Sequence, residues 1–213
     1  MIRKRALHRS KRGRKTVGRC VHQFLIILAN TDPLVWRRIQ VPEDYSFWDL
    51  HVAIQDAMGW RDYHLHEFTV ADDRRAKVVN LGIPDQEIPR EQPCSPGWQV
   101  PIAEYFHEGA PPALYIYDFG DDWRHAVIYE GVSIAEPFVR YPRCVAGARA
   151  CPPEDCGGPY RFAELLAAIL DPSHPDHAGL REWAGDSFDP AVFDAAAVHF
   201  DNPRERWRHA FGE

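Results

Sequence analysis

The sequence predicts an α+β fold, in which a mostly antiparallel sheet of hairpins packs against a few helices and a helical C-terminal region follows. Two observations support this class. Short apolar or alternating segments bounded by turn residues dominate the first two thirds of the chain, and apolar residues at helical spacing dominate the last third. This order, strands first and helices later, is typical of α+β proteins.

An opening hairpin accounts for the first two strands. The segment "VHQFLIILA" (Val21–Ala29) is apolar enough to be a buried strand. The turn signal "NTDPL" follows, and "VWRRIQV" (Val35–Val41) is the second strand, stopped by Pro42. Together they predict two antiparallel strands joined by a short loop.

The helix predicted next has signals at both ends. Ser46 is a candidate N-cap, and Asp49 stands three residues on, at the capping-box position. Gly59 is placed to end the helix in the left-handed conformation. Apolar residues recur at helical spacing between these signals, so we expect a helix over Phe47–Met58.

An alternating strand and a loop-rich stretch come after this helix. "HLHEFTV" (His64–Val70) alternates as a strand does, and "ADDRRAK" reads as a turn or sheet edge. From Asn80 to Pro112 the chain is rich in Pro and Gly. We therefore expect loops there, with one short helical turn near Ile102–Phe106.

A second hairpin is predicted over "ALYIYDFGDDWRHAVIYEGV" (Ala113–Val132). If residues 120–122 form a three-residue loop, Phe119 lies opposite Trp123 and Asp118 lies opposite Arg124. Aromatic residues then face one another on one side of the hairpin and opposite charges pair on the other, which favours this register.

The last third predicts three helices. "PYRFAELLAAILDP" has Pro in its first turn and an apolar stripe, so a helix is expected over Tyr160–Leu170. "HPDHAGLREWAG" predicts a short helix closed by Gly185. "DPAVFDAAAVHF" predicts a third, with Asp189 as N-cap and Pro190 in the first position.

Charge divides the chain into a basic arm, residues 1–19, and a single α+β domain, residues 20–213. The arm has nine Lys and Arg and no acid, so the remaining 16 basic residues face 31 acidic ones, a formal charge of −15 for residues 20–213. A basic arm can bind nucleic acid through phosphates, and the alternatives are a plain disordered tail or an upstream start codon assigned wrongly. The candidate nucleic-acid contacts are Arg3, Lys4, Arg5, Lys11, Arg12, Arg14 and Lys15.

The same composition bears on compartment. The longest apolar run, "FLIILA" (Phe24–Ala29), is too short to cross a membrane and reads better as a strand than as part of a signal peptide. Five cysteines without a disulfide-framework pattern suggest reduced thiols. We therefore expect a cytoplasmic protein without a membrane partner.

Three cysteines crowd into "YPRCVAGARACPPEDCGG" (Tyr141–Gly158) and raise the question of zinc. Cys144, Cys151 and Cys156 could form a structural zinc clip with a fourth ligand from elsewhere, such as His174, His177 or His125. The spacing lacks the tight pair usual in zinc ribbons, so three free thiols in a connector are the alternative. Glu154 and Asp155 are explained by the helix that follows, whose N-terminus favours negative charge.

A second metal hypothesis starts from "HLHEF". On a strand, His64 and His66 point to one face, which is a ligand arrangement used in metal sites. The alternative is a pair of histidines at the rim of the core. If the second hairpin packs beside this strand, a hydrolase that uses a metal-bound water is conceivable. Its residues would be His64, His66 and His125, with Asp118, Asp121 or Asp122.

Four blocks together resemble the plasmid pRiA4b ORF-3-like family and proteins described as passengers of insertion elements. These blocks are "PLVWRRIQVPEDYSFWDLHVAIQDAMGW", "HLHEF", "YIYDFGDDWRHAVIYE" and "YPRCVAGARACPPEDCGGPYRFAELLAAILDPSHPDH", and "FDPAVFD" adds to them. The resemblance covers about residues 21–199 and implies a compact α+β domain. It implies a plasmid or mobile-element context and no reaction, so no catalytic residue follows from it.

Three function hypotheses remain open from the sequence. The lack of a nucleophile elbow, phosphate loop or dinucleotide fingerprint favours a non-catalytic interaction module, which would bind a protein partner or, through the arm, nucleic acid. The alternatives are the metal-dependent hydrolase and the domain with a structural zinc clip. Zinc is the one cofactor that the residues suggest.

Overall fold

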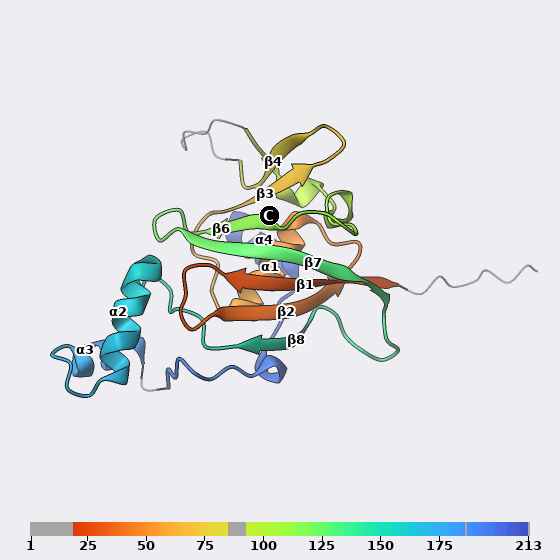
Figure 1. Ribbon diagram of the computed structural model, residues 1–213. Helices are drawn as coiled ribbons and strands as arrows, with labels where there is room; N and C mark the ends of the chain where they lie inside the picture. Colours follow the sequence, from red (N-terminus) through yellow and green to blue (C-terminus); the bar gives the residue numbers. More distant parts are fainter. Residues whose placement is uncertain (1–18, 85–92, 186, 213) are drawn as a thin grey trace, which may run out of the picture.

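A single eight-stranded sheet forms the centre of the molecule (Figure 1). The computed structural model describes residues 19–84, 93–185 and 187–212. The strands are β1 (Cys20–Leu28), β2 (Val35–Pro42), β3 (His66–Asp72), β4 (Lys77–Gly82), β5 (Cys94–Pro96), β6 (Ala113–Tyr117), β7 (Trp123–Ile134) and β8 (Arg143–Ala148). Their order in the sheet is β5-β4-β3-β6-β7-β1-β2-β8, and every neighbouring pair is antiparallel except β4 and β5.

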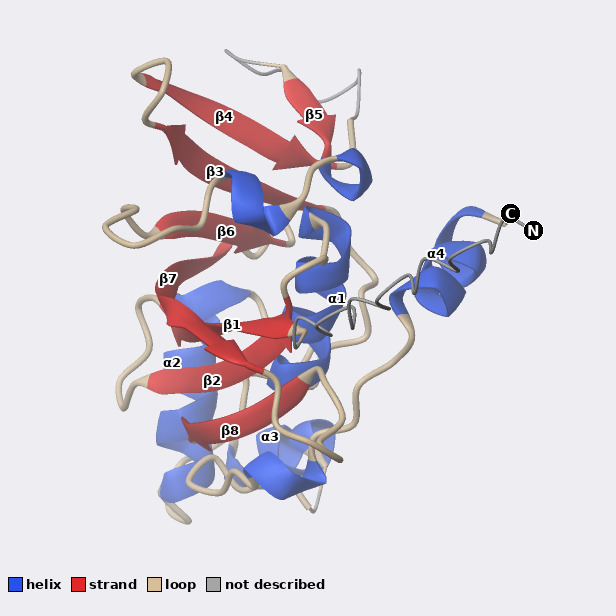
Figure 2. Cartoon of the chain, turned by 90° about the vertical axis from the view of Figure 1, so that its right-hand side faces the viewer, coloured by secondary structure: helices blue, strands red, loops and turns tan. Residues whose placement is uncertain are grey.

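Helix α1 (Phe47–Met58) covers one face of this sheet, and its predicted ends are confirmed. The Ser46 side chain accepts a hydrogen bond from the Asp49 backbone, and the Asp49 side chain accepts one in return from the Ser46 backbone. Gly59 ends the helix with φ of +92°, a left-handed conformation that glycine adopts without strain. Figure 2 shows α1 on one side of the sheet, where it closes the hydrophobic core.

The core lies between α1 and the inward side chains of the strands. Alternate residues of β1, β2, β6 and β7 are buried there, as the two-residue period of a strand requires. Aromatic side chains fill much of the space, and Phe24, Phe47, Phe68 and Tyr115 are fully buried. One helix packed on a mostly antiparallel sheet is the arrangement of an α+β protein, so the predicted fold class is confirmed.

The second hairpin has a longer loop than expected. Tyr117 pairs with Trp123, so residues 118–122 form the loop and the predicted register is wrong by two residues. Asp118 explains the difference, because its Oδ1 accepts hydrogen bonds from the backbone of Gly120 and Asp121 and so builds the turn. A shift of two keeps every side chain on its predicted face.

The remaining strands and helices agree with expectation only in part. Helices α2 (Gly158–Leu170) and α3 (His177–Ala184) are confirmed, and the 3₁₀ turn η2 (Ile102–Glu104) is where a helical turn is predicted. The third predicted helix is wrong, because only a short 3₁₀ turn, η3 (Ala195–Ala197), forms there. Helix α4 (Pro203–Phe211) and strands β4, β5 and β8 are not predicted.

Within the described ranges, the longest helix has 13 residues and no helix is long and apolar enough to cross a membrane.

Candidate functional site

Three loops that are distant in the sequence meet at one end of the sheet. The first precedes β3 and carries His64, the second is the β6–β7 loop with Asp118, and the third leads into α2 and carries Asp155. Each loop belongs to a different block of the sequence that carries the resemblance described above. Their side chains offer one nitrogen and two carboxylate oxygens that all lie within 4.8 Å of one another.

His64 holds the centre of this group. Its Nε2 lies 2.8 Å from Oδ1 of Asp155 and 3.5 Å from Oδ2 of Asp118. Asp118 is held in place because its other oxygen accepts two backbone hydrogen bonds within the hairpin loop. About a third of the His64 side chain is exposed, against 12% for Asp118 and 66% for Asp155, so the group opens to solvent on the Asp155 side.

Glu154 anchors the third loop beneath the group. Its carboxylate accepts hydrogen bonds from the backbone of Arg61, at 2.6 Å, and from the hydroxyl of Tyr117, at 3.1 Å. Tyr117 also accepts a hydrogen bond from the Tyr63 backbone. Burial raises the pKa of Glu154 above its ordinary value, and these donors oppose the rise. Glu154 therefore fixes the backbone immediately before Asp155.

A groove of about 980 Å³ begins at this group and runs between α2 and α3. Asp155 and Cys156 form its near end. Leu165, Leu180 and Trp183 supply apolar lining, and Trp183 is half exposed. The His64 group thus has an open space beside it, large enough for a small ligand.

A second group of possible ligands, His51, Asp62 and His66, is buried under α1. The two imidazole rings are stacked, with centroids 3.4 Å apart and planes 8° apart. In that arrangement the nitrogen lone pairs run parallel, so one ion cannot lie in the plane of both rings. His51 instead lies between the Tyr115 hydroxyl and Asp62, each at 2.8 Å. This geometry is that of a buried hydrogen-bond network.

The metal ligands predicted for a hydrolase do not come together in one site. His64 and Asp118 come together, but His66 belongs to the buried group and His125 lies inside the core against Trp60 and Tyr115. Burial lowers the pKa of His66 well below its ordinary value and that of His125 to about 4.

Asp121 and Asp122 have other partners. Asp121 accepts a hydrogen bond from the Gly157 backbone, and Asp122 pairs with Arg124.

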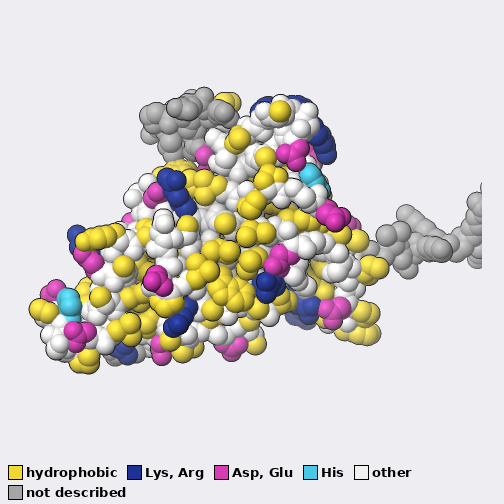
Figure 3. Space-filling view, in the orientation of Figure 1, with side chains coloured by type: hydrophobic (Ala, Val, Ile, Leu, Met, Phe, Trp, Pro, Cys, Tyr) yellow, Lys and Arg dark blue, Asp and Glu magenta, His cyan; other side chains and the backbone are white. Residues whose placement is uncertain are grey.

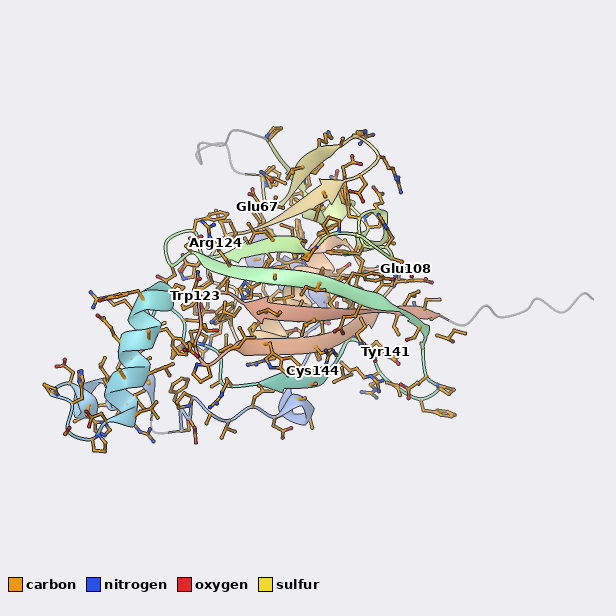
Figure 4. All side chains as sticks on the ribbon, viewed as in Figure 1. Glu67, Glu108, Trp123, Arg124, Tyr141 and Cys144 are labelled. Carbon is orange, nitrogen blue, oxygen red and sulfur yellow. The ribbon has the colours of Figure 1, made fainter. Side chains whose placement is uncertain are left out.

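The three clustered cysteines are spread along their segment. Cys144 lies on the edge strand β8 (Figure 4), while Cys151 and Cys156 follow it and pack against the core. Burial raises the pKa of Cys151 above its ordinary value and that of Cys156 to about 12, which disfavours their thiolate forms. Neither of the two ligand groups found among the described residues contains a cysteine. The zinc clip remains a prediction.

The face of the sheet opposite α1 carries an apolar layer. Leu25 lies opposite Ile128, Ile27 lies between Trp36 and Ala126, and Leu114 continues the row on β6. We call these side chains, with Ile116, the open sheet face: Leu25, Ile27, Trp36, Leu114, Ile116, Ala126 and Ile128. All seven are half-buried, and α1 and α4 lie on the other side in Figures 1 and 2. Figure 3 shows hydrophobic side chains across the middle of this side.

Paired charges lie beside the open sheet face. Arg38 makes a bidentate contact with Glu130, at 2.7 and 2.8 Å, and Gln23 also binds Glu130. Arg124 pairs with Asp122 at the other end of β7 (Figure 4). The face therefore carries little net charge, although residues 20–213 have a formal charge of −15.

Sequence reasoning missed Asp155 and the open sheet face. Asp155 was explained by the helix that follows it, and nothing in the spacing of residues 64, 118 and 155 shows that they meet. One feature of the sequence does indicate the open sheet face. The run "FLIILA" is apolar at consecutive positions, so β1 presents apolar side chains to both faces of the sheet. The candidate nucleic-acid residues of the arm lie outside the described residues.

Comparisons with known proteins agree on a family. A family model described as plasmid pRiA4b ORF-3-like protein matches residues 20–197. The uncharacterized protein y4hQ of Sinorhizobium fredii is 35% identical over 180 residues, which are 84% of this chain and 87% of that protein. A crystal structure of MM3350, a protein of unknown function from Methanosarcina mazei Go1, has a TM-score of 0.80 and 38% identity, and covers 86% of this chain and 99% of that chain.

Proposed function

The chain belongs to the plasmid pRiA4b ORF-3-like protein family, and because the relatives named above have no stated activity, we propose its function from the structure itself: a non-catalytic interaction module that docks a second copy of the chain on the open sheet face. The observation that carries this proposal is the apolar character of outward positions in the central strands. An antiparallel sheet with one face in water normally has polar residues there.

Strand β1 has apolar side chains on both of its faces. Phe24, Ile26 and Leu28 point into the core, and Leu25 and Ile27 point the other way. A run that is apolar at consecutive positions is typical of strands covered on both faces. Within the described part of the molecule, α1 covers only the inner face, so a partner is the natural cover for the outer one.

A second copy suits this face better than an acidic partner or nucleic acid. In each of the pairs Arg38–Glu130 and Arg124–Asp122, the positive and the negative charge cancel. Two copies can therefore approach here without the electrostatic repulsion expected elsewhere between two acidic domains. A flat layer of half-buried side chains also matches sheet-on-sheet packing, in which two faces interdigitate about 10 Å apart. Twofold dimers are the commonest closed assembly, which adds support.

A dimer of this kind would carry two copies of the basic segment, residues 1–19. Two arms on one nucleic acid raise the effective concentration of the second contact. We infer that the arm binds nucleic acid nonspecifically through Arg and Lys, with the acidic body kept away from it.

Sedimentation equilibrium of the full chain tests the docking surface. Ile27→Lys places a charge in the centre of the open sheet face and should weaken self-association about tenfold or more. Leu34→Lys is the matched control, because Leu34 is 47% exposed in the turn after β1 and should leave association unchanged. Ala126→Glu is a second interface variant, in case Ile27→Lys fails to fold. Equal association by all folded variants would disprove the surface.

Salt dependence tests the arm. A full-length variant in which the seven candidate Arg and Lys residues are replaced by Ser should lose binding to a random DNA duplex at low salt. For the unchanged chain, the logarithm of affinity should fall with the logarithm of salt by about 0.9 for each phosphate neutralised. Equal binding by the two proteins would remove nucleic acid from the proposal.

A metal-dependent hydrolase at His64 is the second candidate, favoured by one observation: two carboxylates flank His64 beside a groove. A divalent ion there would supply an activated water. The candidate predicts hydrolysis of a general phosphodiester substrate with Mn²⁺ that Asp155→Asn abolishes. A rate equal to that of the ion alone would exclude it for that substrate class.

A further inference from the structure

We propose that His64, Asp118 and Asp155 bind one divalent transition-metal ion, and that this ion fastens the β6–β7 loop to the loop that leads into α2. The inference concerns the place named for the second candidate function but does not depend on it, because an ion can bind there without any hydrolysis. It is independent of self-association through the open sheet face.

The donor atoms define the class of ion. One imidazole nitrogen and two carboxylate oxygens lie within 4.8 Å of one another, a separation that an ion could span with bonds of about 2.0–2.2 Å after small side-chain shifts. Mixed nitrogen and oxygen donors suit Mn²⁺, Fe²⁺, Co²⁺ or Zn²⁺, whereas Mg²⁺ and Ca²⁺ prefer oxygen alone. The class proposed is therefore a first-row divalent ion.

Two of the ligands are already positioned. The side chain of Asp118 is 12% exposed, and one oxygen is fixed by the backbone of Gly120 and Asp121, which leaves Oδ2 turned toward His64. The loop of Asp155 is held on one side by Glu154, through Arg61 and Tyr117. Ligands that neighbouring hydrogen bonds already hold in place lose less conformational entropy when the ion binds.

Charge and access also support an ion. Among the described residues, His64 is the only basic side chain with a nitrogen within 4 Å of a carboxylate oxygen of Asp118 or Asp155. Two carboxylates therefore share one imidazole, and a divalent ion would balance their charge better. Asp155 lines the groove beside the group, so the remaining coordination positions would face open space that solvent or a ligand can occupy.

Cobalt binding to the full chain provides the test, because Co²⁺ reports its ligands by its visible and near-ultraviolet absorption. We expect one equivalent to bind without thiolate-to-metal charge transfer. Asp155→Asn and His64→Gln should each weaken binding at least about tenfold, because even the loss of an outer-shell partner typically costs 10–100-fold. Asp122→Asn is the matched control from the same hairpin loop, since Asp122 pairs with Arg124 outside the group.

Three results would overturn the proposal. The first is no Co²⁺ or Mn²⁺ binding by calorimetry in protein confirmed to be folded. The second is equal binding by the Asp155→Asn, His64→Gln and Asp122→Asn proteins. The third is a thiolate charge-transfer band, which would show that cysteine is a ligand and, if it is lost on replacing Cys144, Cys151 and Cys156 by Ser, support the zinc clip instead. Binding without hydrolysis would support the ion site and exclude only the second candidate function for the substrate class tested.

Discussion

His64 lies between two carboxylates from different loops, with Nε2 2.8 Å from Asp155 and 3.5 Å from Asp118. This contact joins three segments that the sequence keeps far apart. The loop before α2 is further tied to the hairpin because the Gly157 backbone donates a hydrogen bond to Asp121.

The close approach of α2 to the hairpin should make Gly158 intolerant of a side chain. A Cβ at Gly158 would lie 2.6 Å from the carbonyl oxygen of Asp121, and φ there is +79°. Gly158→Ala should therefore lower the free energy of unfolding by about 1–4 kcal/mol, from strain and overpacking together. Chemical denaturation measures this loss.

Gly59→Ala is the control that separates the two causes. Gly59 has a φ of +92° in the left-handed region, with nothing within 4 Å of its Cβ position, so only strain applies and the loss should be smaller. Equal losses at the two glycines would mean that the contact with Asp121 contributes nothing.

His125 should make stability depend on pH. Burial lowers its pKa to about 4, below the value of about 6.5 in the unfolded chain, so the unfolded chain takes up the proton first as pH falls. The contribution of His125 to the free energy of unfolding is fully present above about pH 7. It falls by about 3 kcal/mol in total as the pH is lowered to about 4.

Denaturant unfolding at several pH values checks this dependence. The His125→Gln protein should show a flatter decline between pH 7 and pH 4 than the unchanged chain, whatever its stability at neutral pH. The comparison removes the contribution of carboxylates, which both proteins share. Parallel curves would contradict the assignment of this proton to His125.

Arg37 should be far more important to stability than Arg38. Arg37 is 1% exposed, donates hydrogen bonds to the carbonyls of Ala57, Trp36 and Ala148, and stacks on Phe193 at 3.6 Å. Lysine cannot reproduce this planar set of donors. Arg37→Lys should cost about 2–4 kcal/mol of unfolding free energy.

The neighbouring Arg38 gives a matched control for that substitution. Its guanidinium is about a third exposed and pairs with Glu130, so Arg38→Lys should cost less than about 1 kcal/mol. Thermal or denaturant unfolding of the two proteins gives the difference. Similar costs would show that the buried contacts of Arg37 are not what stabilises this edge of the sheet.

The sequence predicted the fold where local signals are strong. The capping box at Ser46 and the left-handed Gly59 mark the two ends of α1, and both can be recognised from the local sequence alone. Register was harder, because alternation is unchanged by a shift of two residues and the Asp118 turn decides the loop length. Helix α4 has nine residues, five of them Arg, Glu or His, so its apolar positions Trp207 and Phe211 give only a weak signal. It is held by tertiary contacts, such as the pair of Arg206 with Asp56 and the packing of Trp207 on Trp48.

The site was predictable only in part, for a different reason. His64 and Asp118 were named as ligand candidates, but Asp155 had a sufficient local explanation at the start of α2, and only the folded chain brings it to His64. The alanine-rich segment after Asp189 has the residue types of a helix. It packs along the sheet edge instead, where Phe193 lies so close to Gly147 that a Cβ there would be 2.3 Å from its ring.

The mass of the full chain in solution tests the central claim, which is that the open sheet face docks a second copy. Light scattering at micromolar concentration should give about twice the 24.5 kDa of one chain, and Ile27→Lys should return the mass to that of one chain while Leu34→Lys does not. A mass of 24.5 kDa for the unchanged protein across the accessible concentrations would contradict the account.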